Sequence, residues 1–188
     1  MKKLALLLGF TVVMVACQSH EYYDKLETEL ASGQRYDSLF LDINFGMSQK
    51  DFYAHCWELN KQGIITHGDK NMTVKYELPN QLKAEAQMNF YPDFYKGKIH
   101  KMPVIFSYKA WAPWNTSLSA DSLLLDVVDL YKKWYDDDFI KVSDEGERTA
   151  YIMIKGNRRI SIYKKNPSDV EAMYTDLFVE ESLKKKEG

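Results

Sequence analysis

The chain has 188 residues, with 25 lysine and arginine residues against 27 aspartate and glutamate residues, so its formal net charge is −2 at pH 7. This length supports one domain, or two very small ones, with a real hydrophobic core. The nearly balanced charge does not suggest the basic surface that nucleic-acid binding or polybasic membrane attachment requires, so we expect no nucleic-acid partner.

The first sixteen residues have the composition of a signal peptide. Lys2 and Lys3 form a positive start, and residues 4–16 (LALLLGFTVVMVA) form an apolar run. A membrane-spanning helix needs about 20 apolar residues, so this run is too short for one and fits the apolar region of a signal peptide. We therefore predict a signal peptide at residues 1–16.

The run ends in Met14-Val15-Ala16-Cys17, which resembles a bacterial lipobox. The resemblance implies that the chain is cut before Cys17, that the Cys17 thiol receives a diacylglycerol, and that the new amine is acylated. Each buried methylene adds roughly 0.8 kcal/mol of membrane affinity, so two or three acyl chains form a stable anchor. Residue 18 is Gln rather than Asp, which by the rule for enteric bacteria favours the outer membrane. An ordinary secreted protein with a cysteine at this position is the alternative.

The mature chain is expected to consist of a lipid-anchored tether, residues 17–35, and a single domain, residues 36–188. Tyr22, Leu26 and Leu30 recur at a spacing of four within the tether, which indicates a short helix there. The tether would also lift the domain off the lipid surface.

The domain is predicted to begin with a helix and three strands. Ser48 and Asp51 fit a capping box, and Phe52, Cys56 and Leu59 form the apolar stripe of the helix that follows. Alternation of apolar and polar residues then predicts strands at residues 72–78, 82–90 and 104–110.

The second half has the same predicted order. Ser119 precedes a helix with a wide apolar stripe, and three strands follow at residues 139–142, 149–155 and 158–164. Pro167 suits the first turn of a closing helix. The inner face of that closing helix would consist of Val170, Met173, Tyr174, Leu177 and Phe178.

These elements define an α+β fold. We expect a two-layer sandwich in which an antiparallel sheet carries helices on one face, since each strand has one polar face. The order of helix and three strands occurs twice, and YELPN at residues 76–80 and MIKGN at residues 153–157 fall at matching places. This pattern suggests a duplicated α-β-β-β unit.

The stretch from Ile43 to Phe52 carries a family resemblance. Its apolar-x-x-Gly-Met-Ser pattern leading into a helix is similar to small α+β envelope lipoproteins, including the small lipoprotein of the outer-membrane β-barrel assembly machinery, and to β-lactamase-inhibitor-like modules. As a whole, the chain looks more like the uncharacterised small envelope lipoproteins of the Bacteroidales type. The resemblance implies an envelope location and an α+β fold, and it implies no activity.

No catalytic, metal or cofactor motif is present in the sequence. His55 and Cys56 are neighbours on a helix and diverge by about 100°, so His55 cannot activate the thiol, and Cys56 fits a buried inert cysteine. If Cys17 is lipidated, Cys56 has no disulfide partner.

Metal-binding patterns are also missing from the sequence. His20, His55, His67 and His100 form no i,i+4 pair, and residues 136–138 (DDD) lack the spacing of a calcium loop. A cation or partner contact at that acidic run is left open.

Two tryptophans are the best candidates for recognition. Trp111 and Trp114 flank Ala-Pro, and exposed indoles can stack on sugar rings or anchor a protein partner. The alternative is that both pack between the sheet and the second helix.

Two serines are candidate sites of modification. Ser38 and Ser122 each lie in an Asp-Ser-Leu triplet, which matches the O-glycosylation pattern of Bacteroidales.

We therefore expect a non-catalytic, lipid-anchored cell-envelope protein, in the outer membrane, that binds a protein or a glycan. The alternative is a small hydrolase or enzyme inhibitor whose site forms only in three dimensions. A purely structural spacer in a larger complex is a third possibility.

Overall fold

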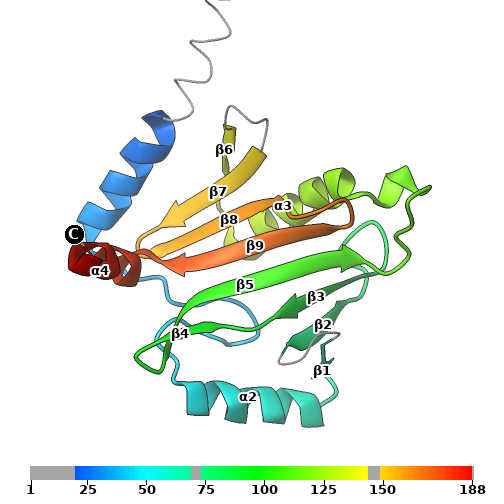
Figure 1. Cartoon of the computed structure of the whole chain (residues 1–188), viewed down its shortest axis with the longest axis horizontal. Helices are drawn as coiled ribbons and strands as arrows, with labels where there is room; N and C mark the ends of the chain where they lie inside the picture. The colour runs from blue at the N-terminus through cyan, green and yellow to red at the C-terminus, as the bar shows by residue number, and fades with distance from the viewer. Residues whose placement is uncertain (1–19, 69–72, 144–148, 188) are drawn as a thin grey trace, which may run out of the picture.

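The computed structural model describes residues 20–68, 73–143 and 149–187. These residues form one open antiparallel sheet of nine strands in the order β1-β2-β3-β5-β9-β8-β7-β6, with β4 paired to β5 (Figure 1). The strands are β1 (Ile65–His67), β2 (Val74–Leu78), β3 (Ala86–Phe90), β4 (Asp93–Tyr95), β5 (Lys98–Tyr108), β6 (Ile140–Ser143), β7 (Thr149–Lys155), β8 (Arg158–Lys164) and β9 (Asp169–Asp176). The helices are residues 20–32, α2 (Gln49–Lys61), the 3-10 turn η1 (Thr116–Leu118), α3 (Ala120–Tyr135) and α4 (Leu177–Glu187). The predicted α+β class with an antiparallel sheet is confirmed.

The sheet is symmetric about its central pair, β5 and β9. In the first half α2 precedes β1, β2, β3 and β5, and in the second half α3 precedes β6, β7, β8 and β9. The turn at Pro79-Asn80 follows β2 and the turn at Gly156-Asn157 follows β7, so the two stretches that matched in sequence occupy equivalent places. The topology thus repeats once, with four principal strands in each half where the sequence predicted three.

The predicted closing helix from Pro167 is wrong over its first half, because residues 169–176 are β9. Val170, Ala172 and Tyr174 alternate into the core, which is the period of a strand. The Asn166 side chain accepts the backbone N–H of Ser168 and of Asp169, both at 2.9 Å, and this local turn starts the strand. Pairing with β5 and β8 on both sides outweighs the helical spacing of the apolar residues.

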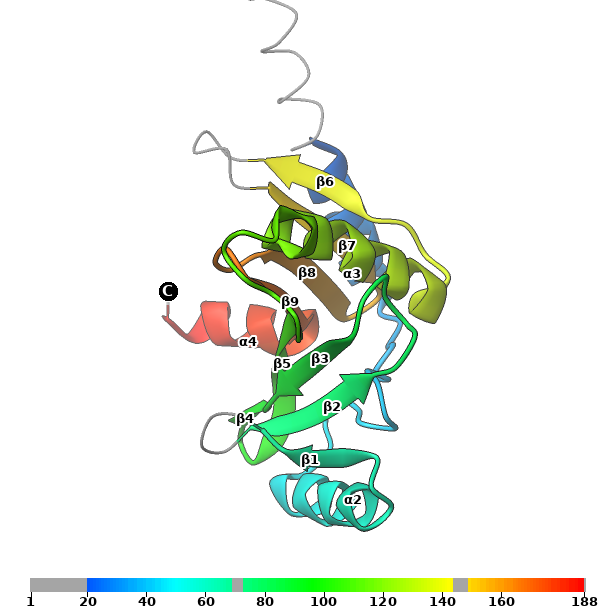
Figure 2. The ribbon, with the colours of Figure 1, turned by 90° about the vertical axis from the view of Figure 1, so that its right-hand side faces the viewer.

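One face of the sheet is covered by α3 (Figure 2). This helix packs on β5, β8 and β9, and seven of its residues are buried: Ala120, Leu123, Leu124, Val127, Val128, Leu130 and Tyr131. Burial of a Leu or Val side chain contributes roughly 1.5–3 kcal/mol, so this contact is a main source of stability. The predicted wide stripe of this helix is therefore confirmed.

Over the first half of the sheet, a loop supplies the covering side chains. Leu39, Phe40, Ile43 and Phe45 are all buried, and the Phe40 ring meets the Phe90 ring edge-on with centroids 4.9 Å apart. Helix α2 lies beyond these residues, next to β1 at the sheet edge (Figures 1 and 2).

Helix α2 is a peripheral element. Its predicted cap is confirmed, since Ser48 Oγ accepts the backbone N–H of Asp51 at 3.1 Å. Phe52 is its one buried residue, and the helix leaves Tyr53 and Trp57 exposed.

The segment that precedes the domain is attached to the turn between β7 and β8. The Gly156 N–H donates to Glu29 Oε2 at 2.7 Å, and the Asn157 N–H donates to the Gln34 carbonyl at 3.2 Å. The fully buried Asn157 side chain accepts the Tyr36 N–H at 2.6 Å and donates to Asp37 at 2.9 Å. Residues 29–35, at the end of the predicted tether, therefore belong to the packed structure. Within the described ranges, no helix combines the length and apolar character needed to cross a bilayer.

Candidate functional site on the open face of the sheet

Strand alternation gives the sheet a second face, opposite α3. Phe106 of β5 contacts Tyr131 of α3, so the neighbouring Ile105 points to the other side. The strand register places Ile105 between Asn89 of β3 and Glu171 of β9. We call this surface the open face.

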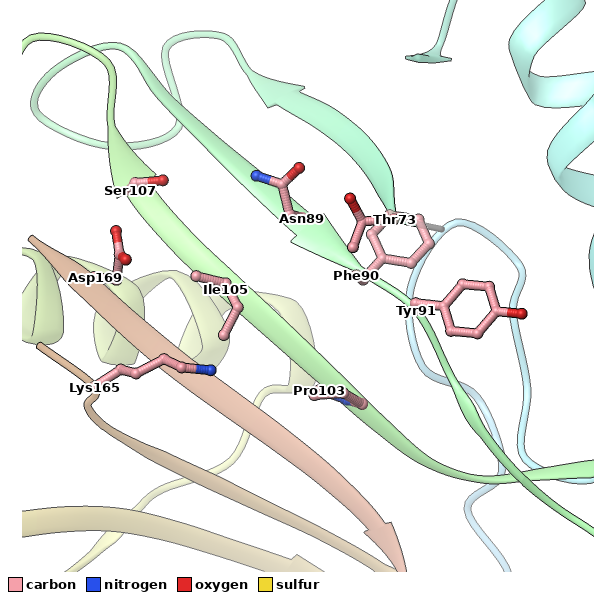
Figure 3. Close-up of a pocket in the computed structure, with 9 residues that line it drawn as sticks. All are labelled: Thr73, Asn89, Phe90, Tyr91, Pro103, Ile105, Ser107, Lys165 and Asp169. Carbon is pink, nitrogen blue, oxygen red and sulfur yellow. The ribbon is translucent and has the colours of Figure 1, made fainter. Parts of the chain in front are cut away.

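A cavity of about 370 Å³ lies on the open face (Figure 3). It is at the small end of the range of ligand pockets, about 300–1,000 Å³. Strands β3 and β5 and the turn before β9 form it, with the lining residues Thr73, Asn89, Phe90, Tyr91, Pro103, Ile105, Ser107, Lys165 and Asp169. Pro103 and Ile105 supply apolar surface, and polar side chains surround them. The cavity therefore combines an apolar floor with groups that can form hydrogen bonds.

A charged pair borders this cavity. Lys165 Nζ lies 2.6 Å from Glu171 Oε2, and Glu171 is only 7 % exposed. A carboxylate removed from water is costly unless it is paired, so Lys165 is the partner that allows Glu171 to remain there. Burial and the nearby Glu171 raise the pKa of Tyr163 to about 12. Figure 3 shows the Lys165 side chain reaching across β9 toward Ile105.

Two further polar side chains stand on the cavity wall. Asp169 is positioned by Asn166, whose Nδ2 donates to its carboxylate at 2.8 Å. Asn89 Oδ1 is buried and has no hydrogen-bond partner among the described residues. This oxygen lies toward Thr73, and the Asn89 amide nitrogen lies on the side of Ser107 (Figure 3).

The two predicted recognition tryptophans differ in environment. Trp114 is 86 % exposed, whereas Trp111 is half-buried and packs against the core. Neither lines the cavity on the open face. A role for Trp114 in partner binding stays a prediction.

The predicted modification sites also differ. Ser38 is exposed and forms an isolated bridge with Asn44, while Ser122 is half-buried in the first turn of α3. Cys17, the predicted lipid attachment site, lies outside the described residues.

The candidates for catalysis do not come together. Cys56 is half-buried on α2, where burial raises the pKa of its thiol to about 11, and His55 Nε2 lies 2.6 Å from the Leu41 carbonyl oxygen. His67 and His100 lie on β1 and β5, outside the cavity lining. No cluster of three or more metal-binding side chains occurs in the described parts of the chain.

The acidic run at the end of α3 has local partners. Asp136 adopts the left-handed conformation that ends the helix, with φ 48°. Asp137 lies 3.7 Å from Lys155, and Asp138 lies 3.2 Å from Lys132. These lysines offset the unfavourable position of carboxylates at a helix C-terminus.

Sequence reasoning missed the cavity for an identifiable reason. Alternation correctly placed Val104 and Phe106 in the core, and the same pattern assigns Ile105 to the opposite face. Asp169 and Glu171 were assigned to a helix, so their position beside β5 was hidden. The Asn166-Pro167-Ser168-Asp169 turn was the local signal that could have revealed a strand start.

Comparison with known protein families, with characterised proteins and with solved structures finds no significant match to this chain.

Proposed function

We propose that the protein is a non-catalytic, lipid-anchored component of the bacterial cell envelope that binds a ligand or partner through the open face of its sheet. The observation that carries the proposal is the cavity over Ile105, with its apolar floor and convergent polar groups. Concave sites of this composition are the usual location of ligand binding.

The chemistry around the cavity favours binding over catalysis. Among the described residues that line it, the titratable side chains are Lys165, Asp169 and Tyr91, and Lys165 is already paired with Glu171. A hydrolase needs a nucleophile or an activated water with a base in reach. Cys56 and the histidines lie elsewhere, so the alternative of a small hydrolase has less support. Inhibition of another enzyme remains compatible with binding through this face.

The membrane anchor rests on the lipobox ending at Cys17. Metabolic labelling with a clickable fatty acid should mark the protein, and Cys17→Ser should abolish both the label and membrane association. An unlabelled protein, or a Cys17→Ser variant that stays equally membrane-bound, would contradict anchoring at this residue.

The binding face is tested by site-specific photo-crosslinking in intact envelopes. A diazirine amino acid at position 107, on the cavity wall, should form adducts. The same group at position 125, where Leu125 is 54 % exposed on α3, should form few. Equal crosslinking at the two positions, or crosslinking at position 125 alone, would reject the open face as the binding surface.

A further inference from the structure

We infer that the cavity on the open face holds a neutral carbohydrate, one or two sugar rings in size. This inference rests on the proposed function and names the chemical class of its ligand. It follows from the backbone, the charges and the hydrogen-bonding groups that surround the cavity.

The backbone N–H and C=O groups of the strands around the cavity are already used in pairing with neighbouring strands. β3 and β5 each pair with strands on both sides, and so does β9. An extended peptide is usually bound by adding it to a free strand edge, which an interior strand does not offer. A ligand here must therefore be recognised by side chains that point away from the sheet.

The charges at the cavity disfavour an ionic ligand. An anion would face Asp169 and the buried Glu171. Lys165 is the cation among the described lining residues, and it lies 2.6 Å from Glu171. A cation would have to approach Lys165. The groups that remain able to bind are hydrogen-bonding groups, which suits a neutral polar molecule.

The hydrogen-bonding groups match hydroxyls. Asn89 supplies amide donors, Asp169 supplies acceptors, and Ser107 can donate or accept. Figure 3 shows the Asn89 amide nitrogen on the side of Ser107, whereas its buried oxygen lies toward Thr73, so the nitrogen is the Asn89 atom that a ligand can reach. A sugar hydroxyl both donates and accepts, and it can satisfy each of these groups.

The apolar floor completes the match. Pro103 and Ile105 lie side by side along β5 beneath the polar wall (Figure 3). The C–H groups on one side of a sugar ring can cover these two side chains while the ring hydroxyls reach outward to Asn89, Ser107 and Asp169. A volume of about 370 Å³ limits the bound portion to a small part of a glycan.

The inference is tested with the lipid-anchored protein purified in a detergent that has no sugar headgroup. The probes are neutral disaccharides (maltose, cellobiose, lactose and chitobiose), with glucuronic acid as the anionic comparison, and binding is read by saturation-transfer NMR. We expect at least one neutral sugar to bind, in the millimolar range or tighter, and glucuronic acid to bind more weakly. Asn89→Ala and Asp169→Ala should each weaken binding roughly tenfold, because each leaves a ligand hydroxyl unpaired.

Ser161→Ala is the matched control, since Ser161 lies on the open face of β8 outside the cavity lining, and it should bind as the parent does. Near-identical circular dichroism and melting temperatures establish that the variants are folded. Binding that is unchanged in both cavity variants, or lost instead in Trp114→Ala, overturns the inference. So does preferential binding of glucuronic acid, or no binding of any neutral sugar at about 50 mM, well above a millimolar Kd.

Failure of this inference is distinguishable from failure of the proposed function. If no sugar binds while the photo-crosslinker at position 107 captures an envelope protein, the ligand class is wrong and the binding face stands. If position 107 also yields no adduct, the proposed binding function fails with it.

Discussion

Gly156 lies directly against the backbone carbonyl of Gln34. A Cβ on residue 156 would be 2.4 Å from that oxygen, and Gly156 has a φ of +54°, which side-chain-bearing residues rarely adopt. The N-terminal segment, residues 29–37, therefore packs directly against the β7–β8 turn, and we call this contact the docking point. If Cys17 carries lipid, the lipidated residue is close in sequence to this docked segment, so the docking would restrict how the domain sits on the membrane.

Gly156→Ala should destabilise the protein by about 1–3 kcal/mol, from backbone strain together with displacement of residue 34. Urea unfolding followed by circular dichroism measures this. Gly46→Ala is the matched control, because Gly46 has a φ of +78° with open space around its Cβ position, and it should show the strain alone. Equal losses in the two variants would show that the contact with Gln34 contributes nothing.

Asn157→Ala should cost about 1–3 kcal/mol, because it leaves the Tyr36 N–H and Asp37 without their buried partner. The double variant with Asp37→Ala should lose less than the sum of the two single losses, since the two residues share one interaction. A double-mutant cycle in urea gives the coupling energy, and strict additivity would argue against the described network.

The contrast between two leucines on α3 tests the core. Leu123 is fully buried, and Leu123→Ala should cost about 2–5 kcal/mol. Leu125 is 54 % exposed on the same helix, so Leu125→Ala should change the free energy of unfolding by less than about 0.5 kcal/mol. Similar effects at both positions would contradict the packing of α3 on the sheet.

Much of this fold could be predicted from alternation and capping, and its central strand could not. Val104 and Phe106 lie in the core as expected, and Ser48 caps α2 as expected. The helix prediction for residues 169–176 was wrong because Val170, Met173, Tyr174 and Leu177 also fit a helical spacing. The evidence that this segment is a strand is its pairing with β5 and β8, which is known only from the structure. The cavity depends on the same non-local pairing, so its residues could not be grouped from the sequence.

Hydrogen exchange tests the corrected strand. Amides of residues 170–175 are in the centre of the sheet and should be among the slowest to exchange, whereas residues 180–186 of α4 should exchange much faster. Mass spectrometry of peptic peptides resolves the two segments. Equal protection across residues 170–186 would favour one continuous helix.

The Cys56 thiol should react slowly in the native protein. Its pKa is raised to about 11 by burial, so at pH 8 only about one thiol in a thousand is ionised. Alkylation by iodoacetamide should accelerate strongly in urea. Because the native thiol stays protonated while the unfolded thiol ionises near its ordinary value of 9.0, the stability from this group should fall as the pH rises from 9 to 11. Rapid native alkylation at pH 8 would show that Cys56 is accessible and ionised.

The most direct test of the binding face compares the protein in its native envelope with the purified protein. Ser107→Cys and Leu125→Cys, each in a Cys56→Ala background, are labelled with a maleimide in isolated envelopes and in pure form. We predict that position 107 is labelled several-fold more slowly in the envelope than after purification, because a ligand or partner covers the cavity, while position 125 reacts at the same rate in both. Equal rates at position 107 in the two preparations would contradict occupation of the open face.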